Sequence, residues 1–279
     1  MNNRRRHDHI WRYFSSAAAL FCAGILGLLL GLLAWNGAHA INLDFLLMPS
    51  RDFGAAGGIL YQMIGSLLLI GCAALISFPI ALGTALYKSE YLHNPFWQKA
   101  THLLLYGLNG VPSVIFGVFG LIFFVNLLGT GLSWFVGSII LAIMILPTIT
   151  LSAYQTLNGI PSIYRQSARA LGLSQWQVIL SVVIPQGCGG AFTGLFIGLA
   201  RAIGETAPIM FIAAAFSGTE LPGSLFEPVV TLPTHILALA QQATDPQALH
   251  NAWGAGCVLF IFVIIFSYLA LWARRRLTL

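Results

Sequence analysis

Charged side chains are scarce in this sequence, because only 8% of its 279 residues are Asp, Glu, Lys or Arg. Soluble globular domains carry about 25% charged residues, so the composition excludes that class. Hydrophobic residues make up 58% of the chain, and the mean hydropathy is +0.84. Such a chain buries its apolar surface in lipid, where helices or a closed barrel must satisfy the backbone polar groups. The apolar runs are long and continuous, which favours helices.

Nucleotide and metal signatures are missing as well. There is no G-x-x-x-x-G-K-[ST] phosphate loop, and Lys88 and Lys99 are the only lysines, so another chain must hydrolyse ATP if ATP drives this protein. The seven histidines are scattered, and we expect no metal site, no bound cofactor and no enzymatic activity. The cysteines all fall in apolar runs and predict neither a disulfide nor a metal framework: Cys22, Cys72, Cys188 and Cys257.

Six apolar stretches predict an all-α polytopic membrane protein. Residues 1–14 form a basic cytoplasmic segment before a first span at 15–35, which is longer than a signal-peptide core and is interpreted as retained rather than as a secretory signal. Residues 36–58 predict an external loop. The core, residues 59–273, holds five more spans, at about 59–87, 102–128, 134–157, 186–216 and 253–273. Its main loops are cytoplasmic at 158–185 and external at 217–251, with a short surface helix at 235–242 and a cytoplasmic tail at 274–279.

The positions of Lys and Arg predict the orientation. With six spans and both termini in the cytoplasm, eleven of the thirteen basic residues are cytoplasmic, Arg51 is external and Arg201 lies within a span. Cytoplasmic loops carry such an excess of Lys and Arg, and the opposite orientation would place those eleven outside. We therefore expect a multi-pass protein of the cytoplasmic membrane with residues 161–185 on the inner side.

Residues 161–185, here named the amphipathic loop, interrupt the apolar sequence. A short helix at 162–171 carries Arg165 and Arg169 one turn apart, and a second one carries Trp176. Gly172 is expected to end the first helix in a left-handed conformation, and Ser174 to cap the second helix. Pro185 is expected to mark the boundary to the next segment. Two short helices with positive charge and an exposed Trp suit docking onto another protein. An ordinary surface-lying connector is the alternative.

The fifth span combines glycines with the only charged pair inside an apolar stretch. On a helical wheel, Arg201 and Glu205 share one face with a glycine stripe at Gly190, Gly194 and Gly198. Such stripes let a second helix approach closely, so we expect these glycines to pack. Charges in a span cost at least about 2.5–3.5 kcal/mol each, so the pair should face protein or a water path. An intrahelical ion pair that neutralises itself is the alternative interpretation.

A second candidate lies in the third span, in the string Asn-Gly-Val-Pro-Ser at 109–113. A proline within a span frees backbone carbonyls, which is tolerated where they line a cavity or find neighbours. Asn109 and Ser113 are therefore candidates for a substrate pathway. A structural kink with no role in a pathway is the alternative.

Three strings resemble the permeases of phosphate-uptake ABC transporters, in particular the PstA subunits. They are Gly110–Gly117, Ala200–Pro208 and the coupling-loop spacing of type I importers, with Gln166 where that pattern has Glu. The resemblance implies a type I ABC importer permease fold with cytoplasmic coupling helices in a bacterial inner membrane. It also implies a heterodimer with a PstC-like permease, a PstB-like ATPase dimer that holds ATP and Mg, and a PstS-like external phosphate-binding protein.

On this interpretation, the residues expected to contact the ATPase are Arg165, Arg169, Gly172 and Trp176. Phosphate near neutral pH keeps a hydroxyl that can donate to a carboxylate, whereas sulfate does not. The hypothesis is that Arg201 contacts passing phosphate, and that Glu205 accepts its proton or limits how tightly Arg201 binds. The alternatives are an ABC permease for another oxyanion or small solute, and a membrane-embedded channel or enzyme that uses Arg201 and Glu205.

Overall fold

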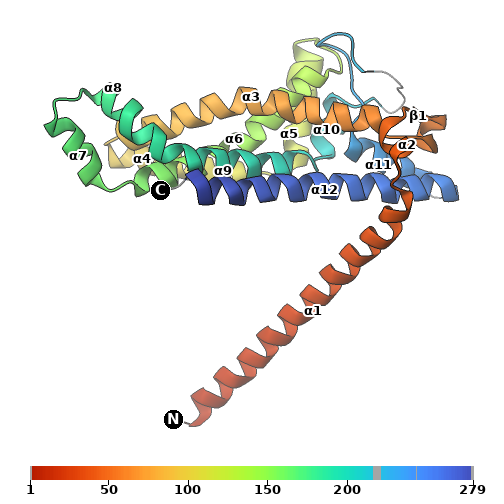
Figure 1. Ribbon diagram of the computed structural model, residues 1–279, viewed down its shortest axis with the longest axis horizontal. Helices are drawn as coiled ribbons and strands as arrows, with labels where there is room; N and C mark the ends of the chain where they lie inside the picture. The colour runs from red at the N-terminus through yellow and green to blue at the C-terminus, as the bar shows by residue number, and fades with distance from the viewer. Residues whose placement is uncertain (1, 216–220, 243, 278–279) are drawn as a thin grey trace.

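The computed structural model of the chain describes residues 2–215, 221–242 and 244–277, and nearly all of its regular structure is helical (Figure 1). Residues 217–220 and 243 of the predicted external loop and residues 278–279 of the predicted tail lie outside the described residues. Five helical stretches are long and apolar enough to cross a membrane: α1 (Asn2–Ala40), α3 (Leu60–Glu90), α6 (Trp134–Gly159), the stretch that ends in α9 (Ile184–Ala202), and α12 (Pro246–Leu277).

The third predicted span is not one helix. It consists of α4 (Pro95–Asn109) and α5 (Ser113–Gly120), which are bent by 90° at residues 110–112, and α5 continues as the π-helical η2 (Leu121–Leu127). The backbone N–H of Gly110 closes the last turn of α4 on the Tyr106 and Gly107 carbonyls, and Pro112 has no N–H to continue it. The bent pair counts as a sixth crossing if it is one span.

The prediction of a helix boundary at Pro185 was wrong. Helix α8 (Gln175–Val178) runs through the π-helical η3 (Ile179–Val183) into α9 without a gap. Pro185 stands at the start of α9, where its missing N–H costs little beside a π-helical turn.

The predicted fifth span also ends early. Helix α9 stops at Ala202, and α10 (Ala207–Ile212) follows a turn closed by bonds from the Gly204 and Glu205 N–H groups to the carbonyls three residues before. Pro208 cannot donate to the Gly204 carbonyl, and Gly204 is a weak helix former, so the helix breaks between them. The helical wheel that places Glu205 on the face of Arg201 therefore does not extend to Glu205.

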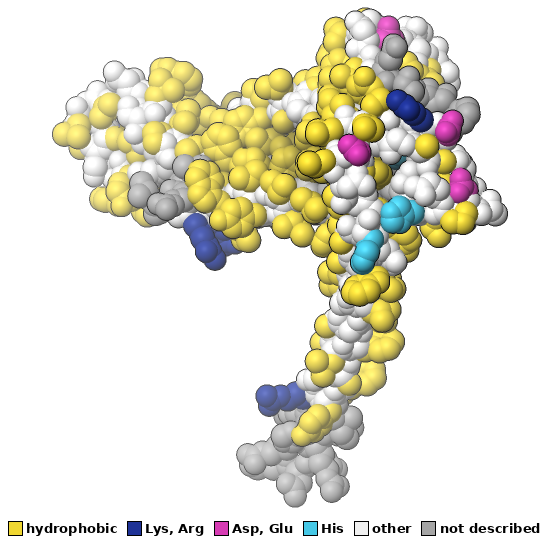
Figure 2. Space-filling model, turned by 45° about the vertical axis from the view of Figure 1, so that its right-hand side comes forward, with side chains coloured by type: hydrophobic (Ala, Val, Ile, Leu, Met, Phe, Trp, Pro, Cys, Tyr) yellow, Lys and Arg dark blue, Asp and Glu magenta, His cyan; other side chains and the backbone are white. Residues whose placement is uncertain are grey.

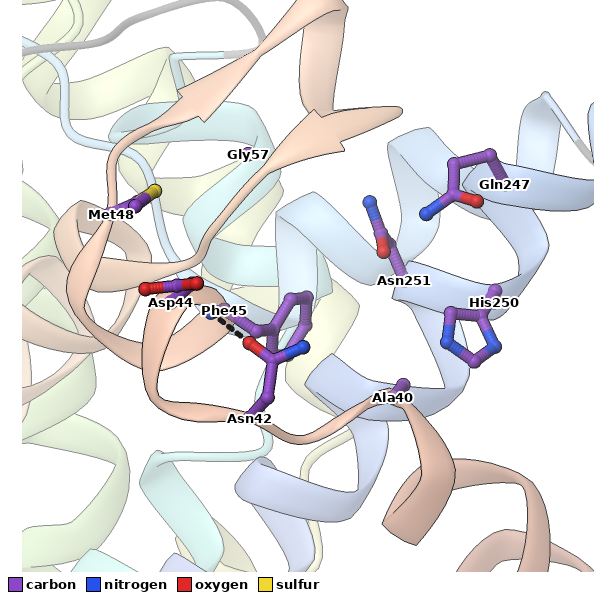
Figure 3. A pocket seen from close by; sticks show the side chains of 9 residues that line it. All are labelled: Ala40, Asn42, Asp44, Phe45, Met48, Gly57, Gln247, His250 and Asn251. Carbon is purple, nitrogen blue, oxygen red and sulfur yellow. Dashed lines mark hydrogen bonds between the residues drawn. The ribbon is translucent and has the colours of Figure 1, made fainter.

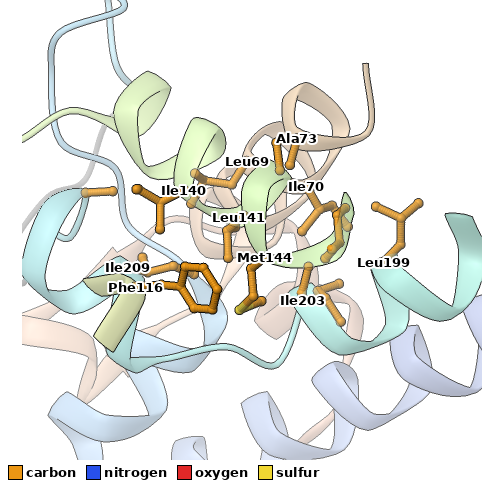
Figure 4. Close-up of a cluster of buried hydrophobic side chains, with 14 of the residues drawn as sticks. Leu69, Ile70, Ala73, Phe116, Ile140, Leu141, Met144, Leu199, Ile203 and Ile209 are labelled. Carbon is orange, nitrogen blue, oxygen red and sulfur yellow. The ribbon is translucent and has the colours of Figure 1, made fainter. Parts of the chain in front are cut away.

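The core lies where α3, α6 and α9 pack side by side, with α10 closing one end. Leu69, Ile140, Met144 and Ile203 come together there and are almost completely buried (Figure 4). Helix α12 packs along α9. This packing fixes α6 and α9 relative to each other, and both carry candidate functional residues.

The two ends of the bundle differ (Figure 1). At one end α7 (Ser162–Ala170) and α8 form the amphipathic loop. At the other end a small cap packs around Phe45, Ile59 and Leu232. The cap consists of α2 (Leu43–Leu47), β1 (Ser50–Arg51), η1 (Asp52–Gly54), β2 (Ala56–Gly57), which pairs antiparallel with β1, and α11 (Leu232–Gln241).

Helix α1 leaves the bundle. It contacts α12 near the cap, where Gly37 lies against Trp253 and Cys257, and then projects away from the other helices (Figure 1). The most apolar part of the helix is 0% buried. Its hydrophobic side chains form a separate column in Figure 2. This apolar surface is available to lipid or to another protein.

Candidate functional site

Arg201 and Asn109 meet although they come from different helices and are far apart in the sequence. An Arg201 Nη1 donates to Asn109 Oδ1 at 3.3 Å, and Arg201 Nε lies 3.5 Å from Glu205 Oε1. The Arg201 side chain is 37% exposed and that of Glu205 is 15% exposed. A guanidinium that is restrained on two sides yet still open offers its remaining donors to an anion.

The local chain breaks place these side chains. Arg201 lies in the last turn of α9, where the negative end of the helix dipole favours a cation. Asn109 is the last residue of α4 before the bend at residues 110–112, and Glu205 lies in the turn before α10. Two broken helices thus bring polar ends together at an internal position of the bundle, as in membrane transporters whose broken helices bind solutes.

Thr148 belongs to the same cluster and was missed by the sequence analysis. Its hydroxyl donates to Asn109 Oδ1 at 3.1 Å, so Asn109 accepts from both Thr148 and Arg201. The one available signal was Pro147 inside α6, which marks an irregular turn next to Thr148. Ser113 is half-buried at the start of α5, and no hydrogen bond described for this chain joins it to the Arg201 cluster.

The glycine stripe of α9 lies against α6. A Cβ atom at Gly194 would come within 2.7 Å of Ser152 Cβ and 3.0 Å of Ile149 Cα. One at Gly190 would collide with Thr156, and one at Gly198 would press on Ile145 at 3.2 Å. The close approach of these two backbones sets the positions of Thr148, which lies between Ile145 and Ile149 within this contact, and of Arg201, which follows Gly198 on α9.

The amphipathic loop has the cap geometry of two short helices. At the end of α7, Gly172 has φ +85°, and the Gly172 and Leu173 N–H groups donate to the Arg169 and Ala168 carbonyls. These two bonds form a Schellman motif, whose left-handed residue is glycine in most proteins. Ser174 then caps α8 in a capping box with Gln177.

Arg165 does not lie on the outer face of this loop. It forms an ion pair with Glu90 at 2.8 Å, and the two side chains are only 17% and 3% exposed. The same guanidinium donates to the Leu157 and Ile160 carbonyls at 2.8 and 2.7 Å. Arg165 therefore ties α7 to the ends of α3 and α6, which corrects the interpretation of this residue as a surface contact.

The outer face of the loop is apolar with one cation. Trp176 is 61% exposed, and Leu171 and Tyr164 are exposed beside it. Arg169 is exposed, and its Nη2 donates to Gln175 Oε1 at 2.6 Å. A face of this composition resembles the core of a protein interface, where Trp, Tyr and Arg are enriched.

A hollow of about 220 Å³ opens in the cap at the opposite end of the bundle (Figure 3). Its rim carries the Asp44 carboxylate, the His250 ring and the Gln247 amide, and Asn42 there accepts a hydrogen bond from the Phe45 N–H at 2.7 Å. In the part of the chain that the structure describes, no three His, Cys, Asp or Glu side chains are grouped to hold a metal ion.

Five or six segments long and apolar enough to cross a membrane, with a polar cluster at two helix breaks and the exposed amphipathic loop at one end, are the features of a polytopic membrane transport subunit. Residues 77–278 match the family described as "Binding-protein-dependent transport system inner membrane component". The chain belongs to this family.

Individual relatives agree with this assignment. The chain is 29% identical to "Probable ABC transporter permease protein YqgI" of Bacillus subtilis, over 97% of this chain and 96% of that one. It is 30% identical to "Phosphate transport system permease protein PstA" of Pasteurella multocida, over 84% of this chain and 82% of that one.

Solved structures share the fold. A permease chain of a bacterial alginate ABC transporter, crystallised with an alginate-bound periplasmic protein, superposes with a TM-score of 0.64 at 18% identity and covers 97% of both chains. A chain of the MetNI methionine ABC transporter superposes with a TM-score of 0.57 at 16% identity, covering 77% of this chain and 92% of that one. The predicted type I ABC importer permease fold is thereby confirmed.

The chain is an ABC importer permease subunit of the inner membrane. It is a non-catalytic component, and ATP hydrolysis takes place on a partner chain. The interpretation as a membrane-embedded enzyme or a channel is therefore wrong.

Proposed function

We propose that this chain is the permease subunit of an ATP-driven importer of inorganic phosphate in a bacterial cytoplasmic membrane, with both termini in the cytoplasm. The observation that carries the proposal is the Arg201 cluster, where a half-exposed guanidinium is held by Asn109 and Glu205. Relatives named as phosphate permeases support the choice of cargo.

The chemistry of the cluster suits phosphate. Arg201 offers a planar fork of N–H donors to a tetrahedral oxyanion. Glu205 lies beside it and accepts the hydroxyl hydrogen that phosphate keeps near neutral pH. Asn109 and Glu205 already use part of the hydrogen-bonding capacity of Arg201. The guanidinium therefore binds the anion weakly enough for it to leave.

The charge of the cap favours delivery of phosphate by a binding protein over binding of free phosphate from solution. Within the cap the described charges are Asp44 and Asp52 against a single Arg51, and Glu227 and Asp245 lie in the segments that flank α11. Figure 2 shows the acidic side chains gathered at this end. A negative surface repels free phosphate, so the anion must arrive enclosed, and a PstS-like protein with a basic docking rim complements this surface.

The other partners follow from two uncovered apolar surfaces. Arg169, Gly172 and Trp176 in the amphipathic loop form the contact with a PstB-like ATPase that binds ATP and Mg. Arg165 positions that loop from inside. The uncovered face of α1 is the surface for a PstC-like second permease, because an apolar helix that leaves its own bundle must be covered by lipid or by a neighbour.

Uptake of labelled phosphate by the reconstituted complex tests the proposal. Arg201→Lys keeps the charge but loses the fork, Glu205→Gln loses the carboxylate, and Asn109→Leu loses the restraint on Arg201. Each change should lower phosphate uptake by about tenfold or more, since a hydrogen bond to a charged group is worth about 1.5–3 kcal/mol. Thr150→Val is the control, because its hydroxyl bonds to Leu146 O within α6, away from the cluster.

Competition by arsenate but not by sulfate is the expected selectivity. Wild-type uptake and wild-type sulfate exclusion in all three variants would make the cluster structural. Competition by sulfate or by a neutral solute at the phosphate level would favour a permease for another oxyanion or small solute.

A further inference from the structure

A cavity of about 400 Å³ lies between α6, α9 and α12, between the Arg201 cluster and the end of the bundle that bears the amphipathic loop. Its wall is polar for a position inside a membrane protein, with three hydroxyls, an amide and a guanidinium. The lining residues include Ser152, Gln155, Thr156, Gly190, Thr193 and Arg274. No Asp or Glu of the described chain lines it. The hydroxyl, amide and guanidinium groups of this wall are hydrogen-bond donors from which an anion can accept.

The hydroxyls can turn toward a ligand at little cost. Ser152 donates to the Gly190 carbonyl, Thr156 to the Ser152 carbonyl and Thr193 to the Gly189 carbonyl, at 2.7, 3.1 and 2.7 Å. All three carbonyls belong to helix interiors, where each also accepts the N–H four residues on. Turning a hydroxyl away therefore leaves no backbone group without a partner.

The cavity continues the face on which Arg201 lies. On α6, Thr148 of the Arg201 cluster precedes Ser152 and Thr156 at four-residue steps, so the three hydroxyls follow one face of the helix. On α9, Gly190, Thr193 and Arg201 fall within about 80° of one another at 100° per residue. At 1.5 Å per residue the cavity reaches about 16 Å from Arg201 toward the loop end.

From these observations we infer that the cavity between α6, α9 and α12 is a second oxyanion site that binds a phosphate group through the Thr156 and Thr193 hydroxyls, Gln155 and Arg274. The inference rests in part on the proposed function, which supplies phosphate as the cargo. Two sources offer the same group: inorganic phosphate on its way from Arg201 to the cytoplasm, and the headgroup of an inner-leaflet phospholipid. Basic pockets between membrane helices on the cytoplasmic side bind such headgroups.

Phosphate protection of a cysteine placed in the cavity tests the inference. The assembled transporter carries Ile197→Cys, at a residue of the cavity wall that is not a proposed ligand, with its four natural cysteines changed to alanine, in vesicles of pure phosphatidylcholine. Inorganic phosphate should slow maleimide labelling of this cysteine several-fold and saturably, relative to chloride at equal ionic strength. If labelling is instead slowed by adding phosphatidylglycerol to the vesicles, without phosphate, the ligand is the lipid headgroup. If neither slows it, the cavity binds no phosphate group and the inference fails.

Matched variants identify the ligands. Thr156→Val together with Thr193→Val keeps the side-chain shape and should raise the phosphate concentration that gives half protection by about tenfold or more. Thr150→Val removes a hydroxyl of α6 that lies outside the cavity, and it should leave protection unchanged. Unchanged protection in the double variant would overturn the assignment of the hydroxyls. Ser152→Cys, also in the cavity wall and not among the proposed ligands, is a second reporter if Ile197→Cys does not assemble.

Uptake in the same vesicles separates this inference from the proposed function. Protection without phosphate uptake would retain the site and reject phosphate as the cargo. Phosphate uptake without protection in either type of vesicle would reject the site and leave the proposed function standing. Arg201→Gln should abolish uptake while protection from the cytoplasmic side persists, because the two sites are about 16 Å apart at their far ends.

Discussion

Several charged side chains of this apolar chain form hydrogen bonds or ion pairs with specific partners. Arg201 is shared between Asn109 and Glu205, and Arg165 between Glu90 and two carbonyls. Lys88 is buried and donates to the Gln98 carbonyl and the Thr101 hydroxyl. A charge away from water is expensive unless it is paired and hydrogen-bonded, so the buried Lys88 and the Arg165–Glu90 pair mark positions that the fold depends on.

The close contact of Gly194 with α6 predicts that no side chain larger than that of glycine fits at this position. Gly194→Ala should destabilise the permease by about 1–3 kcal/mol, because its methyl group would press on the Ile149 backbone. The thermal midpoint of the purified complex measures this. Gly71→Ala on α3 is the matched control, since a Cβ there meets nothing within 4 Å, and it should be neutral or stabilising. Equal midpoints for the two variants would contradict the packing argument.

His235 predicts a pH dependence of the cap. The ring is buried among Gly54, Leu239 and Gln62, and burial lowers its pKa to about 4 from an ordinary 6.5. At a pH between these two pKa values, His235 binds a proton when the cap is unfolded but not when it is folded. The stability of the cap therefore falls as the pH falls from 6.5 toward 4, by roughly 3 kcal/mol in all.

Amide exchange of residues 50–58 and 232–241, corrected for the intrinsic rate, should therefore show less protection at pH 4.5 than at pH 7. His235→Gln should remove most of that difference, whereas His250→Gln at the exposed rim should leave it unchanged. A cap whose protection is independent of pH in the wild type would contradict this reading of His235.

At the scale of elements, breaks in the helices place the residues of the candidate site. The bend between α4 and α5 exposes Asn109, the turn between α9 and α10 holds Glu205, and the Schellman turn after α7 orients the amphipathic loop. A Cβ atom at Gly117 of α5 would come within 2.9 Å of Pro208 Cα in α10. The two broken spans are therefore packed on each other, which joins the elements that carry the Arg201 cluster.

The ion pair between Arg165 and Glu90 predicts a different effect from loss of the exposed Arg169. Arg165→Gln leaves Glu90 buried without its partner, which costs about 3–5 kcal/mol and should loosen α7 from α3 and α6. We expect at least a tenfold drop in solute transported per ATP hydrolysed, with proteolysis within residues 161–185 becoming faster. Arg169→Gln should only weaken ATPase binding, without faster proteolysis.

The double variant Glu90→Gln with Arg165→Gln separates the effect of losing the ion pair from the effect of leaving Glu90 buried without a partner. The double variant leaves no charge buried alone, so its loop should resist proteolysis better than that of Arg165→Gln. If Arg165→Gln and Arg169→Gln had the same effects on transport per ATP hydrolysed and on proteolysis, Arg165 would be a residue that contacts the ATPase and not one that positions the loop.

The whole molecule is a core with two unlike ends and one detached helix. The core joins α3, α6 and α9, and α12 packs along α9. The cap end is acidic, the amphipathic loop is apolar with a cation, and α1 leaves the bundle (Figures 1 and 2). Each exposed feature faces a different partner in the proposed complex. The assignment of those partners depends on which end faces the cytoplasm.

Labelling from one side of the membrane tests that orientation. In intact cells an impermeant maleimide should react with Asp44→Cys in the cap but with Gln177→Cys in the amphipathic loop only after the membrane is permeabilised, because the Lys and Arg excess lies at the loop end. Both side chains are exposed. A Gln177→Cys that reacts in intact cells would place the loop outside, out of reach of an ATPase.

The sequence by itself determined the membrane class, the approximate spans and the two short helices around Gly172. Long uncharged runs have no other stable environment than lipid, and glycine at a left-handed position is a local property of the chain. It also singled out Arg201, Glu205 and Asn109, because charge and a proline break are conspicuous in apolar segments. Only the tertiary structure decided that Asn109 accepts from Arg201 and Thr148 and that Arg165 points inward to Glu90. These are long-range contacts between helices, and helical periodicity carries information about one helix at a time.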